Sequence, residues 1–523
     1  MSHRGPSSTA LYATLLIVLV AVLPAGCGDK SSPSAPTVGP DTVDTVPPDL
    51  IIRYIQRLPE LDYVWGSDNP TRDGWPTPGS QVQWQAHVLN RTPDAQKDLG
   101  YRWTLDGVAV DSGRVDLPAE GEATVEYPWT WTFDRHTLRF EIDPGSDVEE
   151  EPRNDTLTIF TDALSVGFYV EQSLYDLFAA HQADLGIGST SFDDWAQRQI
   201  RRYNEMFAAA KYPETPDGVL DRYRLDKITL VADSALPLVP IPDSLTDFAP
   251  AEAVPNLDDH TVDVQWGFPS WLTSPYTDYT SLDTNNQFYY SGFVQHEMGH
   301  ARYLFDVYSL EVYDGTSGSR VDITENGVRV AGSIYMPGTR INVSGQQGWR
   351  LYAAPQGLMN AQWTYIDRSS AGALNRIAGQ RATRGNYNCP ENCAIYLNDL
   401  PAENRLTVTS GGAPLAGASV RIYRSERSPV IDTLSGYYKK YYADTPDMEL
   451  TADDQGRVLL GRDPFSGGKG IVSVDDFANG TLIVRVEHDG KVGYRFLDVT
   501  QFNEAYWRGE TDLADYMLNV TLH

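Results

Sequence analysis

The chain has 523 residues, of which 71 are acidic, 41 are basic and nine are histidine, so its formal net charge is −30. This acidic surplus argues against nucleic acid or an anionic membrane surface as a partner. The length leaves room for about three domains.

Residues 1–27 have the pattern of an export signal, with a basic start and an apolar run too short to span a bilayer comfortably. The run ends in Leu23-Pro24-Ala25-Gly26-Cys27, which resembles a bacterial lipobox. That resemblance implies lipidation of Cys27 and an extracytoplasmic protein anchored in a membrane by acyl chains. Pro24 departs from the usual lipobox residue, so simple secretion is the alternative. Residues 28–49 are rich in Ser, Pro, Thr and Asp, which is typical of a disordered tether.

Residues 50–163 contain three runs in which polar and apolar side chains alternate, at Ser80–Leu89, Tyr101–Gly107 and His136–Ile142. This pattern predicts an antiparallel β-sandwich. The combination of Asp106-Gly107, Thr137–Phe140 and Asp143–Glu150 resembles the CARDB domain, an Ig-like adhesion module of bacterial surface proteins. The resemblance implies a spacer or a binding role, and no chemistry.

Residues 164–393 have mixed patterning and form the predicted α+β central domain. We expect Ser191 to cap a helix over Phe192–Lys211, with acidic residues in its first turn. Strands are expected at Ile228–Val231 and Thr261–Trp266, before a second helix. A helix, strands and then a histidine-bearing helix is the element order of the upper half of a metzincin peptidase.

The second helix carries His296-Glu297-Met298-Gly299-His300, which matches the H-E-x-x-H signature of zinc hydrolases. Histidines four residues apart lie on one face of a helix, so both imidazoles can bind one Zn²⁺ ion. Glu297 lies beside that face, where it can act as general base toward a zinc-activated water. The alternative is an ordinary helix that happens to contain two histidines.

Asp306 follows His300 at the spacing of the third zinc ligand in metzincin-type peptidases, and Asp306-Val307-Tyr308 resembles the D-x-Y run of immune-inhibitor-type metallopeptidases. The resemblance implies His296, His300 and Asp306 as zinc ligands. These families have glycine where this chain has Tyr303, and that glycine lets the backbone leave the helix sharply. If the helix continues instead, Glu311 and Asp314 are the alternative ligands.

Gly357-Leu358-Met359-Asn360 resembles the Met-turn that lies beneath the metal in metzincins, and the segment Ser369–Ile377 resembles the helix that follows it. The alternatives for Met359 are a core methionine without that role, or Met336 as the turn residue. The family's tyrosine two residues after the methionine is replaced by Ala361. Tyr308 and Tyr365 are therefore the candidate transition-state donors.

Two cysteines besides Cys27, Cys389 and Cys393, are spaced as Cys-Pro-Glu-Asn-Cys. In an oxidising compartment we expect them to form a disulfide, because a lone C-x₃-C is a poor zinc site. Calcium sites would suit the acidic composition, although the sequence contains no calcium-loop motif.

Residues 394–523 are again rich in strand patterns, and the last strand is expected over Tyr516–Leu522. Together with Leu406–Thr409, Gly412–Tyr423 and Asp453–Leu460, these runs resemble the regulatory-like or prealbumin-like β-sandwich of secreted proteins. The resemblance implies an all-β packing or spacer domain.

The sequence therefore predicts two β-sandwiches that flank an α+β zinc endopeptidase, with a protein or peptide as substrate. The alternative is a surface adhesion or glycan-binding protein whose central domain keeps the peptidase shape without its activity.

Overall fold

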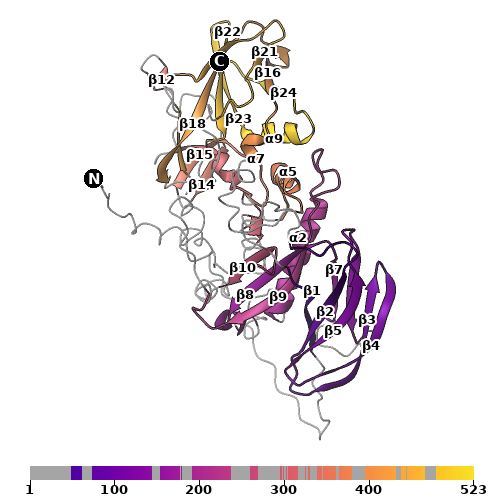
Figure 1. The fold of residues 1–523 in the computed structure, drawn as a ribbon. Coiled ribbons are helices and arrows are strands. Elements are labelled where there is room, and N and C mark those ends of the chain that lie inside the picture. The colour runs from indigo at the N-terminus through magenta and orange to yellow at the C-terminus, as the bar shows by residue number, and fades with distance from the viewer. Residues whose placement is uncertain are drawn as a thin grey trace, which may run out of the picture.

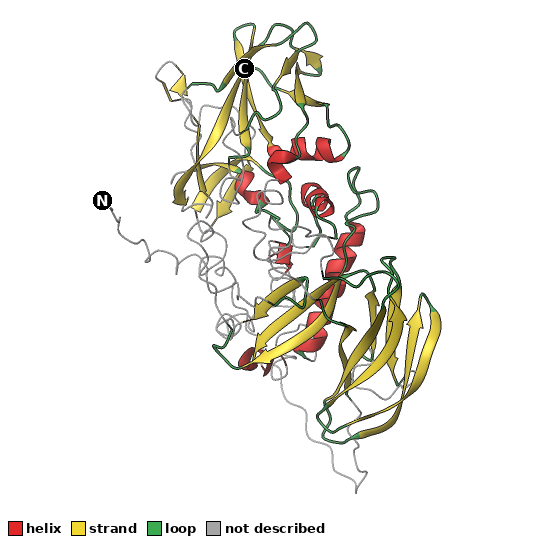
Figure 2. Cartoon of the chain, viewed as in Figure 1, coloured by secondary structure: helices red, strands yellow, loops and turns green. Residues whose placement is uncertain are grey.

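The structure is a computed structural model in which strands predominate and the helices lie mainly in the middle of the molecule (Figure 2). It describes residues 49–61, 74–143, 154–176, 178, 191–236, 259–268, 295–296, 298–299, 302, 304–315, 324–325, 328–329, 339–343, 346–360, 364–379, 395–431, 438–442, 445–465 and 479–523.

The N-terminal part is a sandwich of two antiparallel sheets, as the alternating runs predict (Figure 1). One sheet contains β1 (Leu50–Leu58), β2 (Gln81–Asn90) and β5 (Glu122–Thr130). The other contains β4 (Val108–Leu117), β3 (Gln96–Leu105), β6 (Thr137–Ile142) and β7 (Thr156–Phe160). Alternate side chains of both sheets face inward, so Trp84, Trp103 and Phe140 are fully buried in one core.

The central part begins with a parallel sheet in the order β10-β8-β9, where β8 is Leu164–Glu171, β9 is Tyr223–Val231 and β10 is Val264–Phe268. Between β8 and β9 the helix α2 (Phe192–Ala209) begins at the expected residue, because the Ser191 side chain accepts a hydrogen bond from the Asp194 amide. β10 begins three residues later than expected. The Asp259 carboxylate accepts the Thr261 amide at 2.8 Å, which keeps that segment in a turn.

The next segment adds a small antiparallel sheet and several short elements. The 3₁₀ helix η4 (Val307–Leu310) precedes β11 (Val312–Gly315), which pairs with β15 (Gln346–Tyr352) beside β14 (Thr339–Val343). A two-stranded ladder joins β12 (Thr324–Glu325) to β13 (Val328–Arg329). The helices α5 (Arg368–Arg376) and α7 (Ile395–Asn398) follow.

The C-terminal part consists of two further sheets. The first joins β17 (Ala413–Pro414), β16 (Glu403–Ser410), β21 (Arg457–Leu459) and β24 (Leu513–Asn519), the last of these parallel to β16. The second joins β19 (Tyr438–Tyr442), β18 (Ser419–Ile431), β20 (Met448–Thr451), β22 (Thr481–His488) and β23 (Lys491–Asp498). The expectation of an all-β unit needs correction, because α9 (Val499–Trp507) lies between β23 and β24, capped by Asp498.

The C-terminal part is continuous with the central part through α9, which packs against α5 (Figure 1). A Cβ atom at Gly372 of α5 would overlap the Trp507 indole, so the two helices are in close contact. The Trp507 indole N–H donates to Asp399 at 2.9 Å, and the Thr481 hydroxyl donates to the Leu310 carbonyl at 2.8 Å. One hydrophobic core runs through both parts, so this sandwich is no loosely attached spacer.

The N-terminal sandwich also packs directly on the central part, with β1 against β9 and α2. Arg53 bonds Asp193 of α2 at 2.7 Å, and the Trp75 indole donates to Asp263 at 3.0 Å. The Arg224 guanidinium of β9 lies 4.8 Å from the Trp84 ring centroid. Charge, hydrogen bonding and cation–π contact therefore fix this junction.

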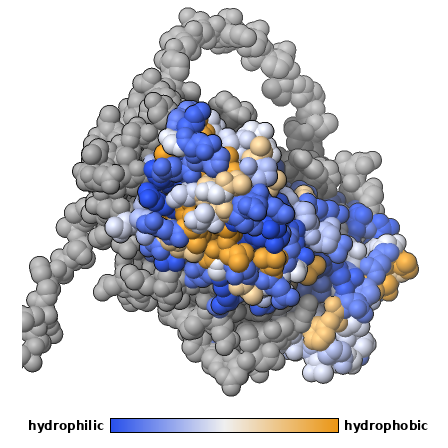
Figure 3. Space-filling model, turned by 90° about the horizontal axis from the view of Figure 1, so that it is seen from above, coloured by the Kyte–Doolittle hydropathy of each residue, from blue (hydrophilic) through white to orange (hydrophobic). Residues whose placement is uncertain are grey.

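Among the described residues on the face shown in Figure 3, most are hydrophilic and surround a smaller hydrophobic area. Within the described ranges, no helix combines the length and the hydrophobicity that a membrane crossing requires.

Candidate metal centre

The H-E-x-x-H motif has helical backbone at the four residues of its segment that the structure describes, Gln295, His296, Met298 and Gly299. Glu297 and His300 lie outside the described residues. The Tyr203 hydroxyl of α2 donates a hydrogen bond to the Gln295 carbonyl, and both residues are buried. Helix α2 therefore anchors the start of the motif from the opposite side of the core.

The chain leaves the helical path shortly after Gly299. The amides of Arg302 and Leu304 both bond the Gly299 carbonyl, at 2.9 and 3.1 Å, and the second bond spans five residues as in a Schellman-type helix end. Asp306 has extended backbone angles, φ −62° and ψ 97°, and precedes η4. Tyr303, the residue that departs from the family pattern, lies outside the described residues. The bonds from Arg302 and Leu304 to Gly299 show that the chain has left the helix by Leu304.

This turn brings Asp306 back to the motif. Asp306 Oδ1 lies 3.1 Å from His296 Nε2, and both side chains are about nine-tenths buried. The other ring nitrogen of His296, Nδ1, lies 2.8 Å from the Leu358 carbonyl oxygen. Because a carbonyl can only accept, Nδ1 carries a proton. Nε2 therefore faces the carboxylate either as the lone pair of a neutral ring or as the second N–H of an imidazolium.

The chemistry of this pair suits a shared zinc ion, and its 3.1 Å separation is a few tenths of an ångström shorter than that of two ligands on one tetrahedral zinc. Two acceptors at 3.1 Å repel each other unless a cation or a proton lies between them. Imidazole nitrogen and carboxylate oxygen are ordinary zinc ligands, and two ligands on one tetrahedral zinc are roughly 3.3–3.5 Å apart. Among the residues that the structure describes, no group of three or more metal-ligating side chains converges, and His300 is not one of those residues.

Met359 lies directly beneath the motif helix. It is fully buried in a tight turn closed by the Asn360 amide and the Gly357 carbonyl, 2.9 Å apart. A Cβ atom at Gly299 would come within 2.8 Å of Met359 Sδ. The Met359 carbonyl accepts the Val307 amide at 3.1 Å, so the turn also holds the segment after Asp306. Met336, the other candidate, lies outside the described residues.

The turn is tied in the same way to the helix that follows it. A Cβ atom at Gly357 would lie 2.6 Å from Asp367 Cβ, so only glycine fits there. Asp367 caps α5 by accepting the Ser370 amide at 2.9 Å. Burial raises the pKa of Asp367, while the hydrogen bonds from Ser370 and Ser369 oppose that shift. The helix expected after Gly357–Asn360 is thus present, and it begins at Arg368.

The alternative ligands and donors lie in different settings. Glu311 is buried and accepts a hydrogen bond from the Asn360 amide group at 3.2 Å, so it supports the turn. Asp314 lies in β11, and its side chain is not described. The Tyr308 ring is nearly parallel to the His296 ring, with an interplanar angle of 7° and centroids 6.4 Å apart. Tyr365 is 41% exposed, and burial of its hydroxyl together with nearby Asp367 raises its pKa.

Two contributors to this site gave no signal in the sequence. The Leu358 carbonyl orients His296, but any residue supplies a carbonyl. Arg302 is buried against Asp221, which also accepts the Gly379 amide at 2.8 Å, and thereby ties the end of the motif helix to the core. Lipidation at Cys27 and the disulfide between Cys389 and Cys393 stay predictions, because these residues lie outside the described ranges.

The chain is similar to several solved domain structures over a fraction of its length. A CARDB domain from Pyrococcus furiosus, solved with two metal ions, is 16% identical; the match covers 23% of this chain and 96% of that domain, with a TM-score of 0.18. A solution structure of the Pyrococcus CARDB domain gives 17% identity, coverage of 22% and 93%, and a TM-score of 0.17.

A domain of a candidate cell surface protein from Methanosarcina acetivorans is 24% identical, with coverage of 22% and 90% and a TM-score of 0.17. TM-scores this low support no inference beyond the likeness itself, and the sandwich is defined by its own strand pairing. No protein-family model matches the chain, and no curated protein is detectably similar to it.

Proposed function

We propose that this protein is an extracytoplasmic zinc-dependent endopeptidase. The observation that carries the proposal is the 3.1 Å approach of His296 Nε2 and Asp306 Oδ1, with Nδ1 held by the Leu358 carbonyl. A buried imidazole nitrogen and a buried carboxylate oxygen that face each other beside an H-E-x-x-H motif need a cation or a proton between them, and a bound zinc ion would supply that cation. The methionine turn beneath Gly299 supports the same reading.

In this proposal His296, His300 and Asp306 would hold zinc. Zinc, when bound, would activate water and polarise the substrate carbonyl. Glu297 accepts the proton of the attacking water and later returns it to the leaving amine, so one side chain acts as base and then as acid. The Leu358 carbonyl keeps His296 in the Nδ1–H tautomer, which leaves Nε2 as the ligand atom.

The proposed setting is the outer side of a bacterial membrane, with acyl chains on Cys27 as the anchor and protein or peptide as the substrate. Mass spectrometry of the native N-terminal peptide tests the anchor, and an unmodified peptide would indicate simple secretion. The alternative function is a non-catalytic adhesion or glycan-binding protein with a peptidase-like central domain. It predicts no turnover even when the metal is bound.

The test measures zinc content and casein hydrolysis on the same preparations. Glu297→Gln should keep zinc yet lose activity by about 10²–10⁴, because general-base help is removed. His296→Ala and Asp306→Asn should lose zinc as well. His488→Ala, which removes a partly exposed histidine of the C-terminal sandwich, is the matched control and should change neither quantity.

One outcome would overturn the proposal, and another would change its set of zinc ligands. If wild type binds zinc but cleaves no protein or peptide, the non-catalytic alternative is correct. If Asp306→Asn keeps full zinc content, Glu311 and Asp314 must be tested as the third ligand.

A further inference from the structure

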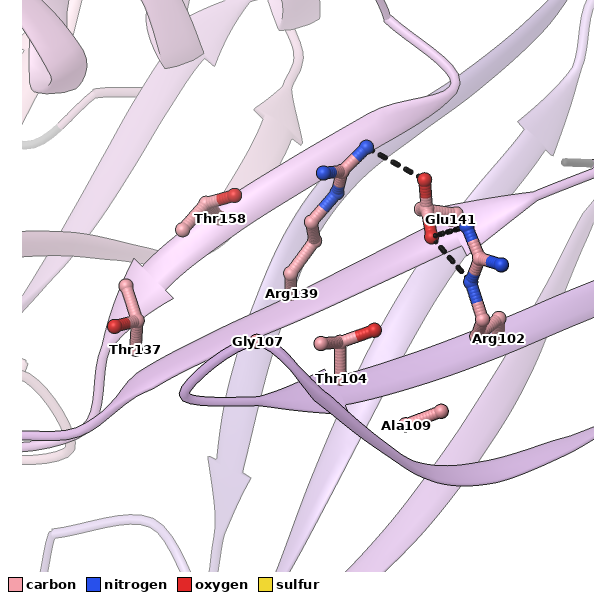
Figure 4. Close-up of a pocket in the computed structure, with 8 residues that line it drawn as sticks. All are labelled: Arg102, Thr104, Gly107, Ala109, Thr137, Arg139, Glu141 and Thr158. Carbon is pink, nitrogen blue, oxygen red and sulfur yellow. Dashed lines mark hydrogen bonds and ion pairs between the residues drawn. The ribbon is translucent and has the colours of Figure 1, made fainter.

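A polar hollow lies on the outward face of the second sheet of the N-terminal sandwich, away from the candidate metal centre (Figure 4). Its volume is about 480 Å³, within the range of small-molecule sites. The side chains that line it rise from β3, β4, β6 and β7, and all but two carry a polar group: Arg102, Thr104, Gly107, Ala109, Thr137, Arg139, Glu141 and Thr158.

Strand pairing places these side chains in rows. Arg102 is directly opposite Glu141, and Thr104 is opposite Arg139, which is opposite Thr158 on the next strand. One row therefore offers a guanidinium between two hydroxyls. The opposite face of the same strands is the apolar core, with Trp103 and Phe140 fully buried, so the backbone beneath the hollow is rigid.

The β3–β4 turn that borders the hollow is also fixed. Asp106 and Gly107 have positive φ values of 48° and 81°, as in a two-residue hairpin turn. The Asp106 carboxylate accepts the Thr137 amide at 2.8 Å and pairs with the His136 ring at 2.7 Å. The turn is thereby held against the start of β6, so a ligand would meet a preformed surface.

The hollow offers the free donors of one arginine rather than a net positive charge. Glu141 is buried between Arg102 and Arg139, with hydrogen bonds of 2.6 and 2.5 Å, and Asp155 also interacts electrostatically with Arg139, so these four charges balance. Arg139 gives only Nη2 to Glu141. Within the described ranges its Nε and Nη1 have no hydrogen-bond partner, and its side chain is 47% exposed. Arginine donors of this kind bind carboxylates strongly.

We infer that this hollow binds an acidic saccharide, with a uronic-acid carboxylate on Arg139 and sugar hydroxyls on the threonines. A carboxylate alone would use the guanidinium but not the threonine hydroxyls. A neutral sugar would leave the free N–H groups of Arg139 without the anionic acceptor that they bind most strongly. Glu141 already occupies part of both guanidiniums, so it competes with the ligand carboxylate and sets the affinity.

The experiment is a calorimetric titration of the full-length protein with an alginate tetrasaccharide and with its carboxyl-reduced neutral form. The acidic form should bind and the reduced form should bind at least tenfold more weakly, because charge-assisted hydrogen bonds are lost. Arg139→Gln should weaken binding of the acidic form at least tenfold. Arg114→Gln, an exposed arginine of the same sheet, is the matched control and should leave it unchanged.

Glu141→Gln gives the sharpest test, because it should strengthen binding several-fold by releasing both guanidiniums. A purely structural salt bridge would predict no gain. The inference is overturned if the acidic form does not bind, or if it binds Arg139→Gln as tightly as the wild type. It is also overturned if inorganic sulfate competes as effectively as the tetrasaccharide itself, because the hollow would then bind any small anion. Thermal melts of each variant show whether it is folded.

Discussion

The contact between Gly299 and Met359 gives a prediction that tests the geometry of the candidate site without any assay of activity. Gly299→Ala adds a Cβ atom that would lie 2.8 Å from Met359 Sδ and 3.4 Å from a Leu304 methyl group. Both neighbours are fully buried, so the methionine can move only by disturbing the core. We expect the substitution to destabilise the wild-type protein and to stabilise a protein that lacks the methionine.

The magnitudes follow from two opposing effects. Alanine in place of glycine favours a helix by about 1 kcal/mol, whereas overpacking a filled core costs about 1–3 kcal/mol. Gly299→Ala alone should therefore lower the free energy of unfolding by about 0–2 kcal/mol. Met359→Ala alone should lower it by about 2–5 kcal/mol. In the Met359→Ala background the overlap is gone, so Gly299→Ala should raise stability by about 1 kcal/mol.

The assay is urea unfolding of the wild type, the two single variants and the double variant, followed by fluorescence. The double-mutant cycle should give a coupling of about 1–3 kcal/mol. Met517→Ala removes a methionine that is 77% exposed and should change stability by less than about 0.5 kcal/mol. If Gly299→Ala stabilises both backgrounds equally, Met359 does not lie beneath the motif helix and the Met-turn assignment is wrong.

Three further predictions concern the neighbouring elements. Burial raises the pKa of Glu504 from 4.5 to about 8, so its stabilising contribution is complete below pH 4.5, declines as the unfolded chain ionises, and is lost by about pH 8. The free energy of unfolding of the wild type should therefore fall with pH between about 4.5 and 8. In Glu504→Gln the slope of that free energy against pH should be less negative by up to about 1.4 kcal/mol per pH unit. Trp507→Ala should lower the free energy of unfolding by about 2–4 kcal/mol. In calorimetry the central and C-terminal parts should still unfold in one transition at a lower temperature, and the C-terminal sandwich should not melt separately. Tyr308→Phe should lower kcat at least tenfold with zinc retained, while Tyr365→Phe changes little; the reverse result would make Tyr365 the donor.

Local signals in the sequence predicted the elements that depend on local physics. Ser191 and the acidic residues after it marked the start of α2, because capping involves atoms only three residues apart. The alternation of polar and apolar side chains predicted the N-terminal sandwich, because one face of each strand is buried. The proximity of His296 and Asp306 was instead implied by the resemblance to metzincin-type peptidases, and the structure places the two side chains 3.1 Å apart.

Long-range packing was not predictable in this way. Helix α9 was missed because Val499–Trp507 has polar residues among its apolar ones and lies between two strands. Its apolar side packs on α5, more than a hundred residues earlier, and no local pattern reports that partner. The Leu358 carbonyl was missed for a simpler reason, since a backbone atom leaves no mark on the residue type.

The junction between the N-terminal sandwich and the central part has a consequence for any molecule that binds to both. Three contacts tie the two parts together at separate points: Arg53 with Asp193, Trp75 with Asp263, and Arg224 with the Trp84 ring. The sandwich therefore cannot rotate as it would on a flexible linker. The separation between the polar hollow and the His296–Asp306 pair is therefore constant. If a glycoprotein were bound at the hollow through its saccharide, only the part of its backbone at that fixed distance from the saccharide could lie at the His296–Asp306 pair. Shorter molecules could not engage both places, and longer flexible ones would gain progressively less local concentration.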